Sequence, residues 1–94
     1  MRPVWLHRAL DDIEAIHSHI ANDRPLAAEA VIQLIRQHVQ QLTLHPHVGR
    51  TGRAESTREL VISGTPYVIP YRVRGERIEI LAVIHGARRW PTTF

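Results

Sequence analysis

The chain has no cysteine and no lysine, and aromatic residues make up only 5% of its 94 positions. Without cysteine there is neither a disulfide framework nor a thiolate metal site. Without lysine, any proton transfer must come from histidine, tyrosine or a carboxylate, because arginine keeps its proton in proteins. No apolar run approaches the roughly 18 residues of a membrane helix, and the N-terminus is too short and polar for a secretory signal. We therefore expect a cytoplasmic protein with no membrane partner.

Positive charge is present, and arginine alone carries it. Twelve arginines stand against nine acidic residues, which gives a net charge of +3 with seven further histidines. Arginine suits the bidentate binding of phosphate or carboxylate, although an arginine-only composition is equally consistent with a composition bias of the source organism. The length and the 44% apolar fraction predict one globular domain spanning residues 1–94.

The spacing of apolar residues predicts two helices. The first starts at residue 8 and ends near residues 21–22, with a stripe at positions i, i+4, i+7 and i+11 counted from Ala9. The second starts at Pro25, which suits a first helical turn, and ends before Pro46. Its stripe consists of Ala28, Val31, Ile32, Ile35, Val39 and Leu42. The short connection predicts an antiparallel helical hairpin.

Four β-prone runs surround this hairpin in the sequence. Residues 2–6 predict an edge strand, and residues 57–62, 67–73 and 78–85 predict three strands joined by tight turns. The last run is nearly all apolar, so we expect it to be central and covered on both faces. Pro70 is expected at an edge or a bulge, because proline cannot donate to a strand ladder.

Together these elements predict an α+β fold. Its order is β-α-α-β-β-β, with the N-terminal strand and the two-helix antiparallel hairpin packed on a mostly antiparallel sheet. Residues 45–56 are expected to form the one long loop.

Familiar catalytic motifs are absent, including glycine-rich nucleotide loops, a nucleophile elbow and the HExxH zinc signature. His17 and His19 lie two positions apart on a predicted helix, so they point in different directions and cannot share an ion. His45 and His47 flank a proline with no evident further ligand. We expect neither a metal site nor a cofactor.

The remaining candidates are strand residues. Arg58 begins one predicted strand, Arg72 ends the next, and His85 and Arg88 follow the last. If they converge, the site would be cationic with one group that titrates near neutral pH, suited to holding a phosphodiester and moving a proton. Convergence depends on the strand register. Arg58 could instead pair with a strand glutamate, and His85 is equally consistent with a structural capping role.

Three further residues are candidates for substrate contact. Arg50 and Arg53 alternate with glycines in the loop at residues 45–56, and such a basic loop can wrap a phosphate backbone. Trp90 could stack on an exposed base. In the alternative interpretation the loop is a solvated connector and Trp90 is a plug that packs onto the core.

Blocks along nearly the whole chain carry a family resemblance. They are Trp5, the pair Asp12-Ile13, PxxAE from Pro25, HPxxGR around Pro46, TRELVI from Thr57, PYVIPYRV from Pro66 and ILxVIHGARxWP from Ile80. In these blocks the chain resembles the RelE/ParE superfamily, the toxins of type II toxin–antitoxin systems. The resemblance implies the same fold of two helices on an antiparallel sheet.

The superfamily divides by mechanism. RelE-like members cut mRNA in the ribosomal A site, whereas ParE-like members lack the catalytic set and poison DNA gyrase. Arg58 and Arg72 match strand arginines that hold the scissile phosphate in RNA-cleaving relatives. His85 falls where some relatives place a catalytic histidine, with Arg88 just beyond it. The lysines typical of RelE are absent.

From this resemblance we expect a growth-arresting toxin that cleaves mRNA on the ribosome as a metal-independent endoribonuclease, with a non-enzymatic gyrase inhibitor as the alternative. The candidate catalytic residues are His85, Arg58, Arg72 and Arg88, and the candidate substrate-binding residues are Arg50, Arg53 and Trp90. The resemblance also implies a cognate antitoxin as partner, and promoter DNA reached only through the antitoxin complex.

Overall fold

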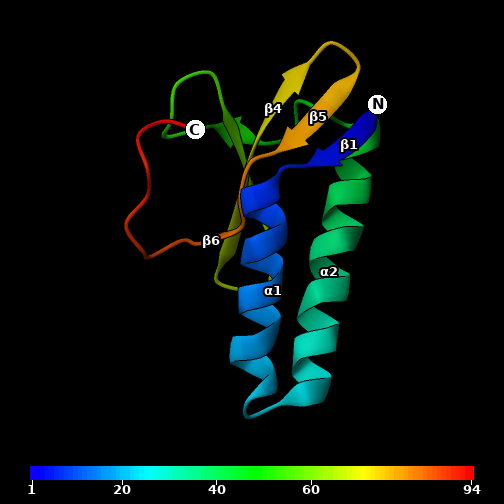
Figure 1. Ribbon diagram of the computed structural model, residues 1–94. Coiled ribbons are helices and arrows are strands. Elements are labelled where there is room, and N and C mark those ends of the chain that lie inside the picture. The colour runs from blue at the N-terminus through cyan, green and yellow to red at the C-terminus, as the bar shows by residue number, and fades with distance from the viewer.

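Two long antiparallel helices form one side of the computed structural model, which describes all 94 residues (Figure 1). α1 (His7–Ala21) and α2 (Pro25–Leu44) are joined by residues 22–24, with Pro25 in the first turn of α2. Their apolar stripes are buried, which confirms the predicted hairpin. The buried residues are Ala9 and Ile16 of α1 and Ala28, Ile32, Ile35, Val39 and Leu42 of α2. Neither helix combines the length and apolar character that crossing a membrane requires.

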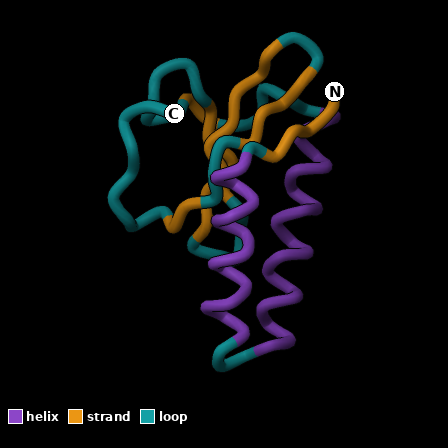
Figure 2. Tube along the Cα trace, in the orientation of Figure 1, coloured by secondary structure: helices purple, strands orange, loops and turns teal.

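Six strands form one sheet in the order β1-β5-β4-β3-β2, with β6 paired to β4. Figure 2 shows the strands in orange and the two helices in purple. β1 runs parallel to β5, and every other pairing is antiparallel. The predicted α+β architecture is confirmed, including the N-terminal edge strand. The strands are β1 (Arg2–Trp5), β2 (Arg50–Thr51), β3 (Arg58–Val61), β4 (Tyr67–Arg74), β5 (Arg77–Ile80) and β6 (Ile84–His85). The short strand β2 lies inside the stretch that was expected to be loop.

The predicted strand at residues 78–85 is interrupted. β5 pairs with residues 71–74 of β4 and β6 pairs with residues 67–68, while residues 81–83 between them are buried but outside the ladder. The expectation of a central, fully covered stretch is confirmed, but that of one continuous strand is wrong.

Pro70 lies in the central strand β4, not at an edge, but the expected bulge is confirmed beside it, because residues 81–83 oppose only residues 69–70 of β4. Its carbonyl accepts the N–H of Leu81 at 3.0 Å, at the interruption between β5 and β6. The nitrogen and oxygen of one strand residue face the same neighbour. The missing N–H of Pro70 therefore faces the gap in the partner strand, where it costs no regular ladder bond.

The two faces of β4 have different surroundings, because side chains alternate along a strand. Ile69 and Tyr71 belong to the core cluster that packs against the helices, and both are fully buried. Val68 and Pro70 lie on the other face and are also buried. The C-terminal segment, residues 86–94, leaves β6 and returns toward the connection between β2 and β3 (Figure 1).

Candidate functional site

Arg72 is bound by a carboxylate of the neighbouring strand. The register pairs it with Glu79 of β5, and its Nε donates to Glu79 Oε1 at 2.6 Å. The Glu79 side chain is only 9% exposed, and Arg74 and Arg77 lie 3.6 and 3.8 Å from its oxygens. The hydrogen bond from Arg72 lowers the pKa of Glu79, against desolvation that raises it. The predicted phosphate-binding arginine is therefore held in an ion-pair network.

Arg58 of β3 lies opposite Tyr71, on the helical face of the sheet. Its Nη1 donates to the carbonyl oxygens of His47 at 3.1 Å and Gly49 at 2.9 Å. The Tyr71 hydroxyl accepts the Gly49 N–H and donates to the Pro46 carbonyl, both at 2.9 Å. Burial raises the pKa of Tyr71, and the hydrogen bond from Gly49 and the charge of Arg58 oppose that shift. Arg58 and Tyr71 thus hold the segment that follows α2, and Arg58 pairs with no strand glutamate.

Glu59 of β3 binds both Arg50 and Arg53. Its side chain is 2% exposed, and Arg50 donates to Oε1 from Nε at 3.1 Å and from Nη2 at 3.0 Å. The backbone N–H of Arg53 donates to Oε2 at 2.7 Å, and its side-chain Nε lies 3.5 Å from Oε1. A buried carboxylate needs such partners. Arg50 and Arg53 do lie together, as expected of a shared site, but they enclose a carboxylate of the protein itself.

Trp90 covers this cluster. The Arg53 guanidinium lies 3.9 Å from the centre of its ring, a favourable cation–π arrangement. Its indole Nε1–H donates to the His85 carbonyl at 3.3 Å. Arg53 therefore covers one of the two ring faces on which a base could stack. Trp90 is half-buried and contacts an arginine rather than the main apolar cluster. It therefore holds the C-terminal segment against residues 45–56.

His85 of β6 lies opposite Tyr67 at the start of β4. The two rings meet edge to face, with centres 6.1 Å apart and planes at 85°. The His85 Nδ1 accepts the N–H of Ala87 at 3.1 Å, so the neutral ring carries its hydrogen on Nε2. His85 borders a cavity of about 380 Å³ that Arg88 and Arg89 also line.

The four predicted catalytic residues fall into two groups. Arg72 lies five residues beyond the partner of His85 on β4, which corresponds to about 17 Å at a rise of ~3.3 Å per residue. Arg58 and Arg72 border a different cavity, of about 440 Å³, whose one histidine is His47. The structure brings Arg58 near Arg72 and Arg88 near His85, but it does not bring the two pairs together.

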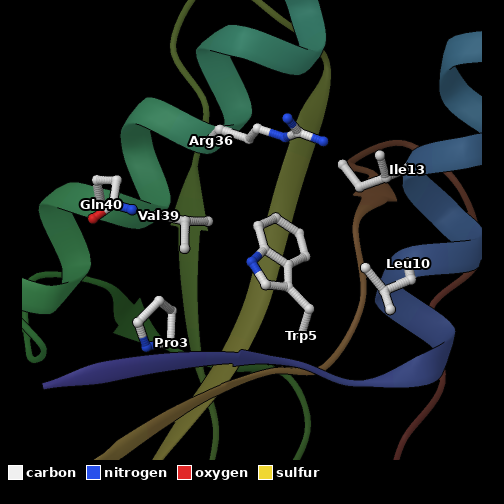
Figure 3. A pocket seen from close by; sticks show the side chains of 7 residues that line it. All are labelled: Pro3, Trp5, Leu10, Ile13, Arg36, Val39 and Gln40. Atoms are coloured by element: carbon white, nitrogen blue, oxygen red, sulfur yellow. The ribbon is translucent and has the colours of Figure 1, made fainter.

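A third cavity, of about 270 Å³, is mainly apolar and lies between β1 and the two helices (Figure 3). Trp5 stands at its centre, between Leu10 and Ile13 of α1 and Val39 of α2. Arg36 is its one charged group, and no histidine, tyrosine or carboxylate lines it. It can accommodate apolar groups, but it offers no side chain for proton transfer.

The histidines form no metal centre. His17 Nε2 lies 2.8 Å from Glu29 Oε1, which links the two helices. Nowhere in the chain do three histidine, aspartate or glutamate side chains gather as a group that could hold a metal ion.

The sequence interpretation missed the structural importance of Glu59 and Glu79. Both are buried on strands, and each holds arginines that had been assigned to substrate. A signal was present for Glu79, which interrupts an otherwise apolar run. A charged residue in a covered strand needs a partner of opposite charge. Glu59 gave no comparable signal, because the short strand β2 that places Arg50 opposite it was not predicted.

Known proteins resemble this chain over nearly its whole length. The family model of the ParE toxin of the type II toxin–antitoxin system parDE matches residues 4–90. Protein Y4kP of Sinorhizobium fredii is 44% identical over 87 residues, 93% of this chain and 90% of that protein. Toxin RelE2 of Caulobacter vibrioides is 38% identical over 85 residues, 90% of this chain and 94% of that toxin.

A solved structure agrees with these sequence matches. A chain from the chromosomal ParDE toxin–antitoxin system of P. aeruginosa has a TM-score of 0.83 at 28% identity, covering 90% of this chain and 95% of that one. The expected resemblance to the RelE/ParE superfamily is confirmed. The chain belongs to the ParE toxin family and is the toxin of a type II toxin–antitoxin system.

Proposed function

We propose that this toxin arrests growth by binding DNA gyrase, without bond-breaking chemistry of its own. Membership of the family implies a cognate antitoxin, and in this proposal the antitoxin neutralises the toxin and carries the complex to promoter DNA. The proposal includes a single domain at residues 1–94 that acts in the cytoplasm. Its main support is the strand register that separates His85 from Arg58 and Arg72.

The separation matters because RNA cleavage needs several groups at one phosphate. A proton acceptor must come within about 3 Å of the attacking 2′-hydroxyl, and cations must stabilise the charge that develops on that same phosphate. The backbone positions of His85 and Arg72 lie about 17 Å apart along β4, and Arg72 alternates onto the opposite face of the sheet from Tyr67, the partner of His85. A phosphate held by Arg72 is therefore out of reach of His85.

The bonds of the two arginines also support a binding role. If Arg72 turned toward a substrate, the buried carboxylate of Glu79 would lose the hydrogen bond that Arg72 donates at 2.6 Å. Breaking a buried ion pair in this way lowers the stability of the fold. If Arg58 turned away, two backbone carbonyls would lose their donor. Both side chains serve the fold in their present positions.

The hydrogen bond at His85 favours the capping interpretation. Its Nδ1 accepts the N–H of Ala87, so a role as proton acceptor at that atom would first require the loss of this bond. The names of the relatives include both RelE and ParE. The choice between the mechanisms therefore depends on geometry.

Two assays with the same purified toxin test the proposal. In a gyrase supercoiling assay we expect inhibition that scales with the ratio of toxin to gyrase, and we expect His85→Ala to retain it. In a cell-free translation reaction with mapped mRNA ends we expect intact mRNA.

Cleavage in the ribosomal A site would overturn the proposal. If His85→Ala then lowered the cleavage rate by about 100-fold or more, His85 would be the proton-transfer group. The same loss in His47→Ala would assign that role to the histidine beside Arg58 and Arg72.

A further inference from the structure

A cationic cavity lies between α1 and the C-terminal segment, on the helical face of the sheet. Its volume is about 380 Å³. α1 contributes Arg8 and His19, β6 contributes His85, and the C-terminal segment contributes Arg88 and Arg89. Three arginines and two histidines thus surround one space.

The positive charge of this cavity is not balanced within the chain. None of the eight ion pairs involves Arg88 or Arg89. The one carboxylate in the wall, Asp12, is already engaged, because its Oδ2 accepts the Val83 N–H at 2.9 Å and lies 3.5 Å from Arg8 Nε. The cavity therefore favours an anionic occupant.

The remaining wall indicates which kind of anion fits. Besides its charged groups the cavity is lined by Ala15, Ile16, Tyr67, Val83 and Ile84. The phosphate groups of a nucleic-acid backbone have no apolar side chains to place against such residues. A peptide with acidic and apolar side chains does, and protein interfaces combine an apolar centre with a polar rim in this way.

We propose that this cavity receives an acidic, partly apolar segment of the cognate antitoxin. Its carboxylates pair with Arg88 and Arg89, whose planar guanidinium groups match carboxylates bidentately. Its apolar side chains pack on Ile16 and Tyr67. The inference rests on the antitoxin partner that the family implies, and it does not depend on gyrase being the target.

The test compares two double variants that remove the same charge. The cavity variant Arg88→Ala/Arg89→Ala removes the two arginines of the cavity that have no ion-pair partner. The control variant Arg2→Ala/Arg24→Ala removes two exposed arginines outside the cavity that also have no ion-pair partner. By calorimetric titration with the purified cognate antitoxin, we expect the cavity variant to bind at least about tenfold more weakly. The control should remain within about threefold of wild type, since exposed charges contribute little.

Salt dependence gives a second readout. Raising the salt from about 0.1 M to about 0.5 M should weaken wild-type binding more than binding by the cavity variant, because screening acts on the pairs that the variant lacks. Urea unfolding of each variant checks that the fold is intact. The charge reversal Arg88→Glu/Arg89→Glu should weaken binding further.

Equal antitoxin affinity of the cavity and control variants would overturn the inference. In a parallel titration, a labelled DNA duplex is added to free toxin. If the cavity variant loses only DNA binding and keeps its antitoxin affinity, the occupant is a phosphate backbone and the proposal is wrong. Because no gyrase is present, failure of the gyrase proposal would not affect these outcomes.

Discussion

Two groups of arginines in this toxin differ in what they face. Arg50, Arg53 and Arg72, on and beside the strands, are held by the buried carboxylates Glu59 and Glu79. Those of the C-terminal segment, Arg88 and Arg89, border a cavity whose one carboxylate is already engaged. The same residue type therefore stabilises the fold in one region and remains available to a partner in the other.

A count of arginines therefore does not locate a binding surface. A buried glutamate fixes an arginine by giving it a partner that water cannot replace. An exposed arginine without such a partner keeps its charge available to other molecules. Three predictions test this difference, from the largest effect to the smallest.

The largest effect is expected for Glu59→Ala. We expect the free energy of unfolding to fall by about 2–3 kcal/mol, because Arg50 and the Arg53 N–H lose their acceptor. The side chains of Arg50 and Arg53 are 53% and 43% exposed and can reach water, which keeps the loss below that of a fully buried pair. Urea denaturation followed by circular dichroism measures it.

Glu55→Ala is the matched control for this prediction, because Glu55 is exposed in the same connection. It should change stability by no more than about 0.5 kcal/mol. A Glu59 variant as stable as this control would remove the distinction between the two groups of arginines.

A smaller effect is expected at Glu79, and it depends on pH. Arg72 lowers the folded-state pKa of Glu79 below its usual value of 4.5. The resulting stabilisation is fully present above about pH 4.5 and is lost as the pH falls through the folded pKa. In Glu79→Gln the free energy of unfolding should therefore depend less on pH in the acid range than it does in the wild type. Parallel wild-type and variant curves between about pH 5 and pH 3 would contradict this linkage.

The smallest effect is expected when the free arginines are removed. Arg88→Ala/Arg89→Ala should change the free energy of unfolding by no more than about 0.5 kcal/mol, because neither side chain has an ion-pair partner. The same double variant should show the loss of antitoxin affinity. A stability loss comparable to that of Glu59→Ala would instead make the C-terminal segment part of the stabilising core.

Much of the fold could be predicted from the sequence because its signals are local. The stripe from Ala28 to Leu42 follows the helical period, and Pro25 begins that helix, so both helix positions followed from nearby residues. The interruption at residues 81–83 could not be predicted in this way. There the Val83 N–H is bound by Asp12 of α1, across 71 positions of sequence.

The candidate site was harder to predict than the fold. The sequence indicated Arg58, Arg72, His85 and Arg88 as candidates and left open whether they converge, because side-chain chemistry alone gave no reason to divide them. Their division follows from the pairing of β4 with β6 at one end and with β5 at the other. A strand places residues by their distance along the ladder, and nothing local fixes which partner lies opposite.

The helical hairpin, the strand-rich second half and the family of the toxin all follow from local patterns in the sequence. Tertiary structure alone decided which arginines are free. Glu59 and Glu79 take their partners through strand pairing and loop closure, whereas Arg88 and Arg89 lie beyond the last strand, where no carboxylate of the chain pairs with them. The physical reason is that helix formation depends on neighbours within one or two turns, while ion pairing depends on distances that only the folded sheet sets.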